Sequence, residues 1–473
     1  MKQKQYLDGF AHGFGRVPEI SVNRLAKSIE KIRRSVGLSL YRMFEEVLPA
    51  ESVVRRSGER RRGYDSATTL WAMLSQTMRG SSQRDVVREL QAVDELLGRP
   101  VRSGNTGSYA EARGRLSDAT VESAHERLAE RIEQMTPQEQ VRSGRLLSVD
   151  ATGVQLDDTK ANLKYYKYAA CQKPGCGFPV MQQVALMDLG SGTVIDAIET
   201  AQDEGESPLF EAGLRHHIGE GDVLLADRAY CSFVNIIRVL EAGGDALMRL
   251  NSSRNKEALK KSDDVVVRWR RPDFSASPLH LFHEDWEQLP ESIEVRLVRY
   301  RVAMKGYRTR EVLMATTLME ESVDELAALY RRRWEIETEF RHLKTTLGME
   351  HIHVKSPEMA YKQMYVFFIA HNLIRWLMLQ AANEHDVDPT RISFKGAVDC
   401  MQRWISEMAH LKRKDFAAMK DRMLQILARD IVPKRPDRIE PRRLKKRLKR
   451  FTLLTFPRSK YLTDEEYLKA ALS

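Results

Sequence analysis

The order of apolar segments between residues 143 and 251 constrains the fold more than any other feature of the sequence. An apolar strand (145–156) comes first, followed by two strands joined by the turn "DLGSG" (180–200). A helix (206–222) and a strand that starts at 222 and ends in Asp227 come next. A second helix (233–244) and a short strand (245–251) complete the series. This order predicts a mixed α/β fold with a ribonuclease-H-like core. In such a core the first and fourth strands lie side by side at the centre of the sheet.

Two carboxylates occupy the places where buried strands are predicted to end. Asp150 ends the apolar part of the first strand and Asp227 ends the fourth, so we expect the two side chains to be neighbours. Other acids fit less well. Asp157 comes too late to lie on the first strand, Asp188 is in a hairpin turn that favours Asp, and Asp222 opens the fourth strand at the opposite edge of the sheet.

A third carboxylate comes from the helical stretch "YRRRWEIETEFRHLK" (330–344). At about 100° per residue, one face of this helix combines an aromatic hydroxyl, cations and a single glutamate. The members of this face are Tyr330, Arg333, Glu337, Arg341 and Lys344. Such a carboxylate could hold a metal while its neighbours bind phosphate oxygens. An ordinary ion pair between Arg333 and Glu337, four residues apart, explains the same helix equally well.

The other two glutamates of this stretch are predicted to point away from that face. Glu335 and Glu339 lie near about 140° and 180° when Tyr330 is taken as zero. We therefore expect replacement of either by Gln to be tolerated.

Three such acids suit metal-dependent cleavage of a phosphodiester. Two Mg²⁺ ions roughly 3.5–4 Å apart can activate the attacking oxygen and stabilise the leaving one. Mg²⁺ takes hard oxygen ligands and keeps several waters, so a few carboxylates suffice. We expect a pair of Mg²⁺ ions at Asp150, Asp227 and Glu337, with Mn²⁺ able to substitute.

Three motifs resemble those of bacterial DDE transposases of the insertion-element-four type. They are "SVDATGVQ" around Asp150, "LLADRAYCS" around Asp227, and the signature Y-x2-R-x3-E-x6-K, met by Tyr330, Arg333, Glu337 and Lys344. The resemblance implies that the catalytic and metal-binding residues are Asp150, Asp227 and Glu337. It implies that the DNA-binding residues are Tyr330, Arg333, Trp334, Lys344 and Arg228. Some relatives continue the second motif as Asp-Arg-Glu-Ala-Asp, whereas this chain has "DRAYC", so no second acid there is assigned a role.

The resemblance also implies an activity, a cut-and-paste DNA transposase. Such an enzyme binds the inverted repeats at the ends of its element and hydrolyses one strand to free a 3′-hydroxyl. That hydroxyl attacks the opposite strand, and the resulting hairpin is reopened before insertion into target DNA. Pairing of two ends implies a homodimer in the synaptic complex with double-stranded DNA. Two alternatives stay open, a metal-dependent nuclease of the same fold and an inert DNA-binding regulator derived from a transposase.

Composition agrees with a DNA-binding protein. The net charge of +10 favours an anionic partner. The most apolar stretch, which starts at Met364, is interrupted by His371, Asn372 and Arg375, so we expect a buried helix and no membrane span. Cys171 and Cys176 have no second pair at matching spacing, so free thiols are favoured over a zinc site. We expect a bacterial cytoplasmic protein that is associated with the nucleoid when it binds DNA.

The chain is predicted to contain three regions. Residues 1–135 are predicted to form a helical DNA-binding domain, although a plain helical bundle explains the same pattern. In this region a helix ends at Gly80 and the next starts with a capping box of Ser82 and Asp85. Residues 143–430 form the catalytic domain, with a β-rich insertion at about 252–318. Residues 431–473 form a basic segment that contains the phosphate-contacting arm "KRPDRIEPRRLKKRLKR".

Overall fold

A computed structural model gives the fold of most of the chain. It describes residues 36–55, 63–96, 98–136, 144–169, 173, 175–201, 206–250, 257–260, 262–274, 283–301, 311–408, 411–433, 454–457 and 459–460. The basic arm at 434–450 and Cys171 lie outside these residues.

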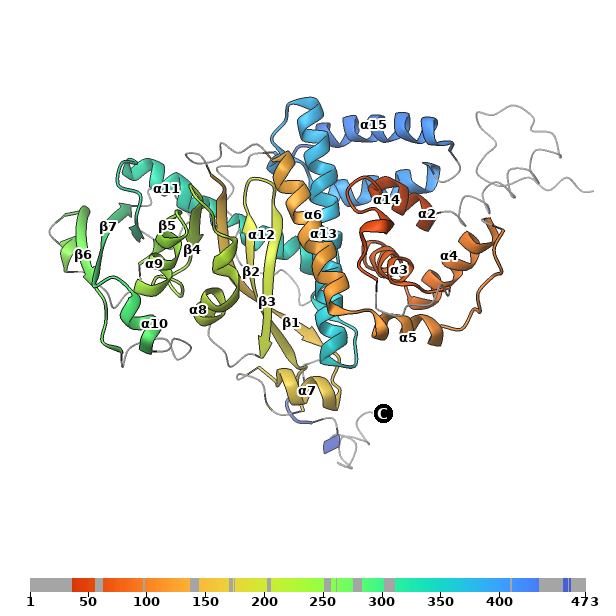
Figure 1. The fold of residues 1–473 in the computed structure, drawn as a ribbon, viewed down its shortest axis with the longest axis horizontal. Helices are drawn as coiled ribbons and strands as arrows, with labels where there is room; N and C mark the ends of the chain where they lie inside the picture. Colours follow the sequence, from red (N-terminus) through yellow and green to blue (C-terminus); the bar gives the residue numbers. More distant parts are fainter. Residues whose placement is uncertain are drawn as a thin grey trace, which may run out of the picture.

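A single mixed sheet forms the centre of the molecule (Figure 1). Its first five strands are β1 (Leu146–Leu156), β2 (Val180–Asp188), β3 (Thr193–Ala201), β4 (Val223–Ala226) and β5 (Asp245–Arg249). They are arranged in the order β3-β2-β1-β4-β5, with β1, β4 and β5 parallel and β2 antiparallel to both neighbours. The predicted mixed α/β fold is therefore confirmed, and the first and fourth strands lie side by side as the ribonuclease-H-like core requires.

The position of Asp150 within its strand differs from the prediction. Asp150 lies in the middle of β1, not at its end, because β1 continues to pair with β2 as far as Gln155. The short strand β4 ends at Ala226, opposite Val149. Asp150 is therefore level with the end of β4 although its own strand runs on.

Three further strands extend the sheet beyond β5. They are β6 (Asp264–Arg270), β7 (Ser292–Arg301) and β8 (Glu311–Thr316), with α10 (His283–Gln288) between β6 and β7. All three are antiparallel to their neighbours, in the order β5-β8-β7-β6. The predicted strands are thus present, and they continue the central sheet. That they form an insertion into a smaller core stays a prediction.

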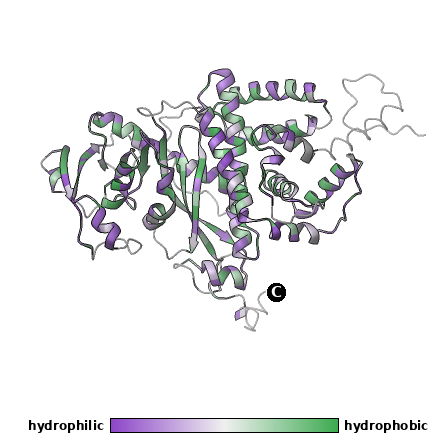
Figure 2. Ribbon diagram, viewed as in Figure 1, coloured by the Kyte–Doolittle hydropathy of each residue, from purple (hydrophilic) through white to green (hydrophobic). Residues whose placement is uncertain are grey.

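Helices cover both faces of the sheet (Figure 1). The shorter ones are α7 (Lys160–Tyr166), α8 (Glu206–Leu209) with its continuation η2 (Phe210–Leu214) and η3 (Arg215–His217), and α9 (Phe233–Glu241). The amino-terminal helices are α2 (Val36–Phe44), α3 (Ser66–Arg79), α4 (Gln83–Leu96), α5 (Gly107–Arg115) and α6 (Asp118–Met135). The carboxy-terminal ones are α13 (Pro357–His385), α14 (Phe394–Met408) and α15 (Arg413–Arg429). Figure 2 shows mainly hydrophobic residues along the central strands that these helices cover.

The predicted helix boundaries near residue 80 are confirmed. Gly80 ends α3 in the left-handed conformation, with φ at +58°, which glycine adopts without a steric penalty. The Ser82 backbone N–H donates to the Asp85 carboxylate, and the Asp85 N–H donates to the Ser82 hydroxyl. The expected capping box therefore starts α4.

The apolar helix α13 is buried along most of its length. It lies against α3, α6 and β3, and these elements share one hydrophobic core. None of the described helices is both long and apolar enough to cross a membrane. The prediction of a buried helix for this segment is confirmed.

Candidate active site

The alternation of side chains along the strands directs two acids to one face of the sheet. Leu147 and Val149 pack on the α9 side, whereas Leu146 and Leu225 pack on the opposite side beneath α11 (Val323–Arg332). Because side chains alternate along a strand, Asp150 follows Leu146 to that second side. Val149 pairs with Ala226, so the next residues, Asp150 and Asp227, are level on adjacent strands, which lie about 4.8 Å apart.

The helix that carries the third acid is interrupted at its centre. The first part, α11, starts with a capping box at Ser322 and ends at Arg332. Two tight backbone hydrogen bonds follow, from Arg333 N–H to the Tyr330 carbonyl (3.1 Å) and from Trp334 N–H to the Arg331 carbonyl (3.3 Å). The chain then continues as α12 (Glu335–Arg341) and the wide turn η6 (His342–Thr346). The sequence predicted one continuous helix, whereas in the structure the helix is interrupted by a tight turn at Arg333 and Trp334.

Arg333 connects two of the three acids. Its guanidinium Nη1 donates to Asp150 Oδ2 at 3.2 Å, and Nη2 donates to Glu337 Oε1 at 3.4 Å. The Arg333 side chain is 6% exposed, compared with 23% for Asp150 and 48% for Glu337. The predicted ion pair between Arg333 and Glu337 is present, and the same guanidinium also reaches the sheet.

The charges at this site influence one another. Burial raises the pKa of the Asp150 carboxyl, and the charge of Asp227 adds to that rise, whereas Arg333 opposes it. For Arg333, burial lowers the pKa, but the Tyr330 phenol and the charges of Asp150, Asp227 and Glu337 raise it above its ordinary value. A buried cation among three carboxylates is stabilised in its charged form.

The remaining predicted DNA-binding residues differ in exposure. Tyr330 is buried beside the end of β4, where its hydroxyl donates to the Ala226 carbonyl at 3.4 Å. Trp334 is 56% exposed, and the Arg333 guanidinium lies 4.9 Å from its ring centroid. Arg228 is exposed next to Asp227. Trp334 and Arg228 are therefore open to a partner, whereas Tyr330 is covered by the protein.

A hollow of about 500 Å³ extends from the acids along α12 and η6. It is lined by Asp150, Ala151, Thr152, Glu337, Phe340, Arg341, Lys344, Thr345 and Glu350. Burial lowers the pKa of Lys344, and Glu350 partly opposes this effect. Glu337, Arg341 and Lys344, predicted on one helix face, thus line one hollow together with Asp150.

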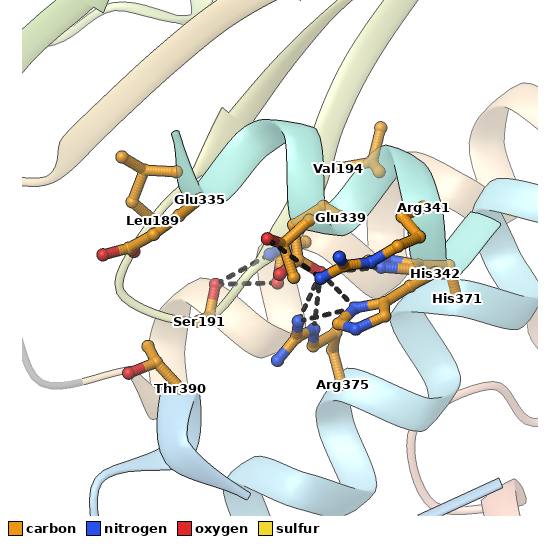
Figure 3. A network of polar contacts seen from close by, with 12 residues as sticks. Leu189, Ser191, Val194, Glu335, Glu339, Arg341, His342, His371, Arg375 and Thr390 are labelled. Carbon is orange, nitrogen blue, oxygen red and sulfur yellow. Dashed lines mark hydrogen bonds and ion pairs between the residues drawn. The ribbon is translucent and has the colours of Figure 1, made fainter. Parts of the chain in front are cut away.

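Glu339 occupies a very different environment from the one expected (Figure 3). It is 6% exposed and accepts hydrogen bonds from Arg375 through both Nε (3.1 Å) and Nη2, from His371 Nε2 (3.1 Å) and from His342 Nδ1 (3.3 Å). Burial alone would raise the pKa of this carboxyl, but the Arg375 charge and the two histidine hydrogen bonds lower it well below its usual value. The prediction that Glu339 tolerates replacement by Gln is inconsistent with this buried network.

A sequence signal for this network was present in α13. His371 and Arg375 are four residues apart in an otherwise apolar helix, so they share one face. Polar groups buried in such a helix require partners. Glu339, on the side of α12 that faces away from Glu337, is the partner that the sequence did not identify.

The donor set at Asp150, Asp227 and Glu337 fits a hard divalent cation. Its oxygens are carboxylates, the ligands that Mg²⁺ and Mn²⁺ prefer. In the structure the Arg333 guanidinium partly neutralises them, and its buried Nε has no hydrogen-bond partner among the described residues. The chemistry of the acids and their convergence are therefore compatible with metal binding.

Comparisons with known proteins agree with this geometry. Residues 142–373, which include all three acids, match the family model described as "Transposase DDE domain". These findings support a DDE transposase.

Two relatives are described as transposases of insertion sequence elements. The chain is 24% identical over 304 residues to "Transposase InsG for insertion sequence element IS4" of Escherichia coli (strain K12), a match that covers 62% of this chain and 66% of the relative. It is 27% identical over 192 residues to "Probable transposase for insertion sequence element IS5377" of Geobacillus stearothermophilus, covering 38% of this chain and 48% of the relative. The chain therefore spans less than two thirds of the length of either relative. Among solved structures, a piggyBac transposase synaptic complex with hairpin DNA aligns with 85% of this chain and 87% of its own, at 11% identity and a TM-score of 0.44.

Proposed function

We propose that this protein is a cut-and-paste DNA transposase. It would bind the inverted repeats of its insertion element, cleave the ends by Mg²⁺-dependent phosphodiester hydrolysis and join them to target DNA as a homodimer in the synaptic complex. The observation that carries the proposal is that the Arg333 guanidinium bridges Asp150 and Glu337, while Asp227 follows the end of β4 level with Asp150. The transposase DDE family match over residues 142–373 supports it.

Each residue has a distinct task in this proposal. Asp150, Asp227 and Glu337 would hold two Mg²⁺ ions, which supply activation of the attacking oxygen and stabilisation of the leaving one. Arg333 keeps Asp150 and Glu337 close together before DNA arrives and then offers its charge to a phosphate. Lys344, at the far side of the same hollow, would bind a phosphate of the cut strand.

Three further residues are proposed to contact DNA or to support those that do. Trp334 presents its exposed ring to an unstacked base, which an aromatic face can hold without sequence preference. Arg228, exposed beside Asp227, would contact the backbone. Tyr330 is buried, so it would act by packing against β4 and Arg333 until the site opens.

The chemistry uses two kinds of displacement at phosphorus. In the first, a water oxygen bonds to phosphorus while the bond to the 3′-oxygen breaks, which leaves a 3′-hydroxyl and a 5′-phosphate. In the second, a 3′-hydroxyl attacks another phosphodiester and expels its 3′-oxygen. The number of phosphodiester bonds is conserved in the second step, so no external energy source is required.

Substitution of the acids tests the proposal. We expect Asp150→Asn, Asp227→Asn and Glu337→Gln each to reduce Mg²⁺-dependent cleavage of terminal-repeat DNA to background, while the Kd for that DNA changes by less than about threefold, because phosphate contacts supply most of the affinity. Gel-based cleavage and binding assays measure the two effects separately. Glu335→Gln is the matched control, since Glu335 pairs with Arg332 outside the group of acids. Full activity of Glu337→Gln would refute the assignment.

The product distribution separates the transposase from the nuclease alternative. A transposase yields DNA in which element ends are joined to a target molecule, whereas a nuclease yields cut ends without joining. The substrate comes from the genome, where short inverted repeats should flank the coding region. Cleavage without joined products, on DNA that carries both repeats, would favour the nuclease.

A further inference from the structure

A second group of ligands lies at the far end of β1, away from the acids. Asp157 follows the last residue of β1, and His351 and His353 lie on and just after the short strand β9 (His351–Ile352). Their ligand atoms all lie within 4.8 Å of one another. We infer that Asp157, His351 and His353 form a binding site for a zinc-like divalent transition-metal ion, separate from the proposed Mg²⁺ site.

The distances within the group suit such an ion. Asp157 Oδ1 lies 3.2 Å from His351 Nε2 and 3.0 Å from His353 Nδ1. Zinc bonds of about 2.0–2.2 Å in tetrahedral geometry place two ligand atoms about 3.3–3.5 Å apart. The observed separations are slightly shorter, so a small outward adjustment of the side chains would admit the ion.

The backbone that bears the ligands is held in place before any ion binds. β9 pairs with β1 in parallel register, Gln155 opposite His351. The fully buried Asn162 donates through Nδ2 to the Asp157 carbonyl (3.0 Å) and to the Val354 carbonyl (2.8 Å), so one amide joins the two ligand-bearing segments. Thr159 Oγ1 adds a hydrogen bond to the Lys355 carbonyl at 2.9 Å. Preorganised ligands lose little conformational freedom on binding.

The chemistry of the ligands distinguishes this site from the acids at Asp150. Imidazole nitrogens suit zinc and its neighbours in the first transition series, whereas Mg²⁺ prefers oxygen. Two histidines and one carboxylate leave a fourth position for water. That position faces solvent, since the His353 side chain is 78% exposed. Seven residues of strand separate Asp150 from Asp157, or roughly 20 Å, so one ion cannot serve both sites.

Two other groups of similar composition fit an ion less well. In the group formed by Glu339, His342 and His371, the Arg375 guanidinium already neutralises the Glu339 carboxylate. Asp196, with His216 and His217, also accepts a hydrogen bond from the Tyr365 hydroxyl. Both groups therefore offer a carboxylate that is already engaged by another protein donor.

The site has a structural consequence if it is filled. An ion there would link the end of β1, the strand that carries Asp150, to β9, which follows Lys344 by seven residues. It would thus fix β1, which carries Asp150, to the segment that follows the helix carrying Glu337.

Metal binding to the full-length protein tests this inference without any activity assay. The protein is stripped with a chelator and dialysed against Zn²⁺ in the presence of excess Mg²⁺, and bound zinc is measured by mass spectrometry. We expect one tightly bound Zn²⁺ per chain, and a loss of affinity of at least about tenfold in His353→Gln and in Asp157→Asn, as expected when a ligand of a preorganised site is lost. Zn²⁺ should also raise the Tm of the unmodified protein more than that of His353→Gln, because the ion binds the folded state.

Two controls locate the ion. His216→Gln removes an exposed histidine of the Asp196 group and should leave Zn²⁺ affinity unchanged. A triple variant, Asp150→Asn, Asp227→Asn and Glu337→Gln, should also retain the zinc, which separates this site from the proposed active site. Failure of the unmodified protein to bind Zn²⁺, or unchanged affinity in His353→Gln, would overturn the inference.

Discussion

At the scale of single residues, Glu339 shows that two carboxylates on one short helix can have opposite roles. Glu337 is exposed and faces the hollow, whereas Glu339 is buried against α13. Glu339 neutralises Arg375, whose guanidinium also packs so closely on the hairpin glycine Gly192 that a Cβ there would lie 2.6 Å from it. Because Gly192 also has a φ of +73°, the turn between β2 and β3 requires glycine for two reasons. One buried ion pair thus joins α12, α13 and the β2–β3 hairpin.

Replacement of Glu339 should therefore destabilise the protein. Glu339→Gln keeps the shape of the side chain but leaves the Arg375 charge buried without a counter-ion, which costs on the order of 3–5 kcal/mol. Urea denaturation followed by circular dichroism measures the free energy of unfolding. Glu335→Gln, the same change at a partly exposed position paired with Arg332, should cost less than about 1 kcal/mol. Equal losses in the two variants would contradict the argument.

The same carboxylate predicts how stability depends on pH. The folded-state pKa of Glu339 is below its usual value of 4.5. Its contribution is therefore fully present above that value and is lost as the pH falls below it, towards the folded-state pKa. As the pH falls below 4.5, the free energy of unfolding of the unmodified protein should decrease more than that of Glu339→Gln.

At the scale of elements, the capping box of α11 fixes where the acid-bearing helical segment starts. The Ser322 hydroxyl accepts from the Glu325 backbone N–H, and the Glu325 carboxylate accepts from the Ser322 N–H. Beyond the tight turn at Arg333 and Trp334 the chain stays helical, and Arg333 contacts both Asp150 and Glu337.

Removal of this cap should weaken the helix measurably. Ser322→Ala eliminates the side-chain acceptor and should cost about 1 kcal/mol of unfolding free energy. Ser322→Asp retains an acceptor and should stay within a few tenths of a kcal/mol of the unmodified protein. Denaturant titration of both variants measures the difference, and equal stability of Ser322→Ala and the unmodified protein would show that the cap contributes nothing.

At the scale of the whole molecule, the amino-terminal helices and the carboxy-terminal helices share one core. Phe44 of α2 contacts Trp376 of α13 with ring centroids 5.9 Å apart, and α6 lies against both α13 and β3. Buried residues from α3, α6 and α13 belong to the same hydrophobic core. The helices within residues 36–135 therefore complete the burial of α13 and the sheet.

A truncated chain tests whether residues 1–135 form a separable domain. Residues 136–473 alone would expose the buried face of α13, and we expect this fragment to be insoluble or to unfold without cooperativity. Expression followed by thermal unfolding measures both properties. A soluble fragment with a cooperative transition would show that the amino-terminal region is an independent domain.

The sequence by itself determined the order of strands and helices and indicated three candidate acids, because strand and helix periodicities are local and a carboxylate on such an element is visible in the chain. It also determined the boundaries near Gly80 and Ser82, where capping depends on residues close in sequence. Only the tertiary structure decided that Asp150 lies in mid-strand, that Arg333 bridges two acids and that Glu339 is buried. These features depend on pairing between residues far apart in the chain, and the free energy of burying a charge is set by partners that no local pattern reveals.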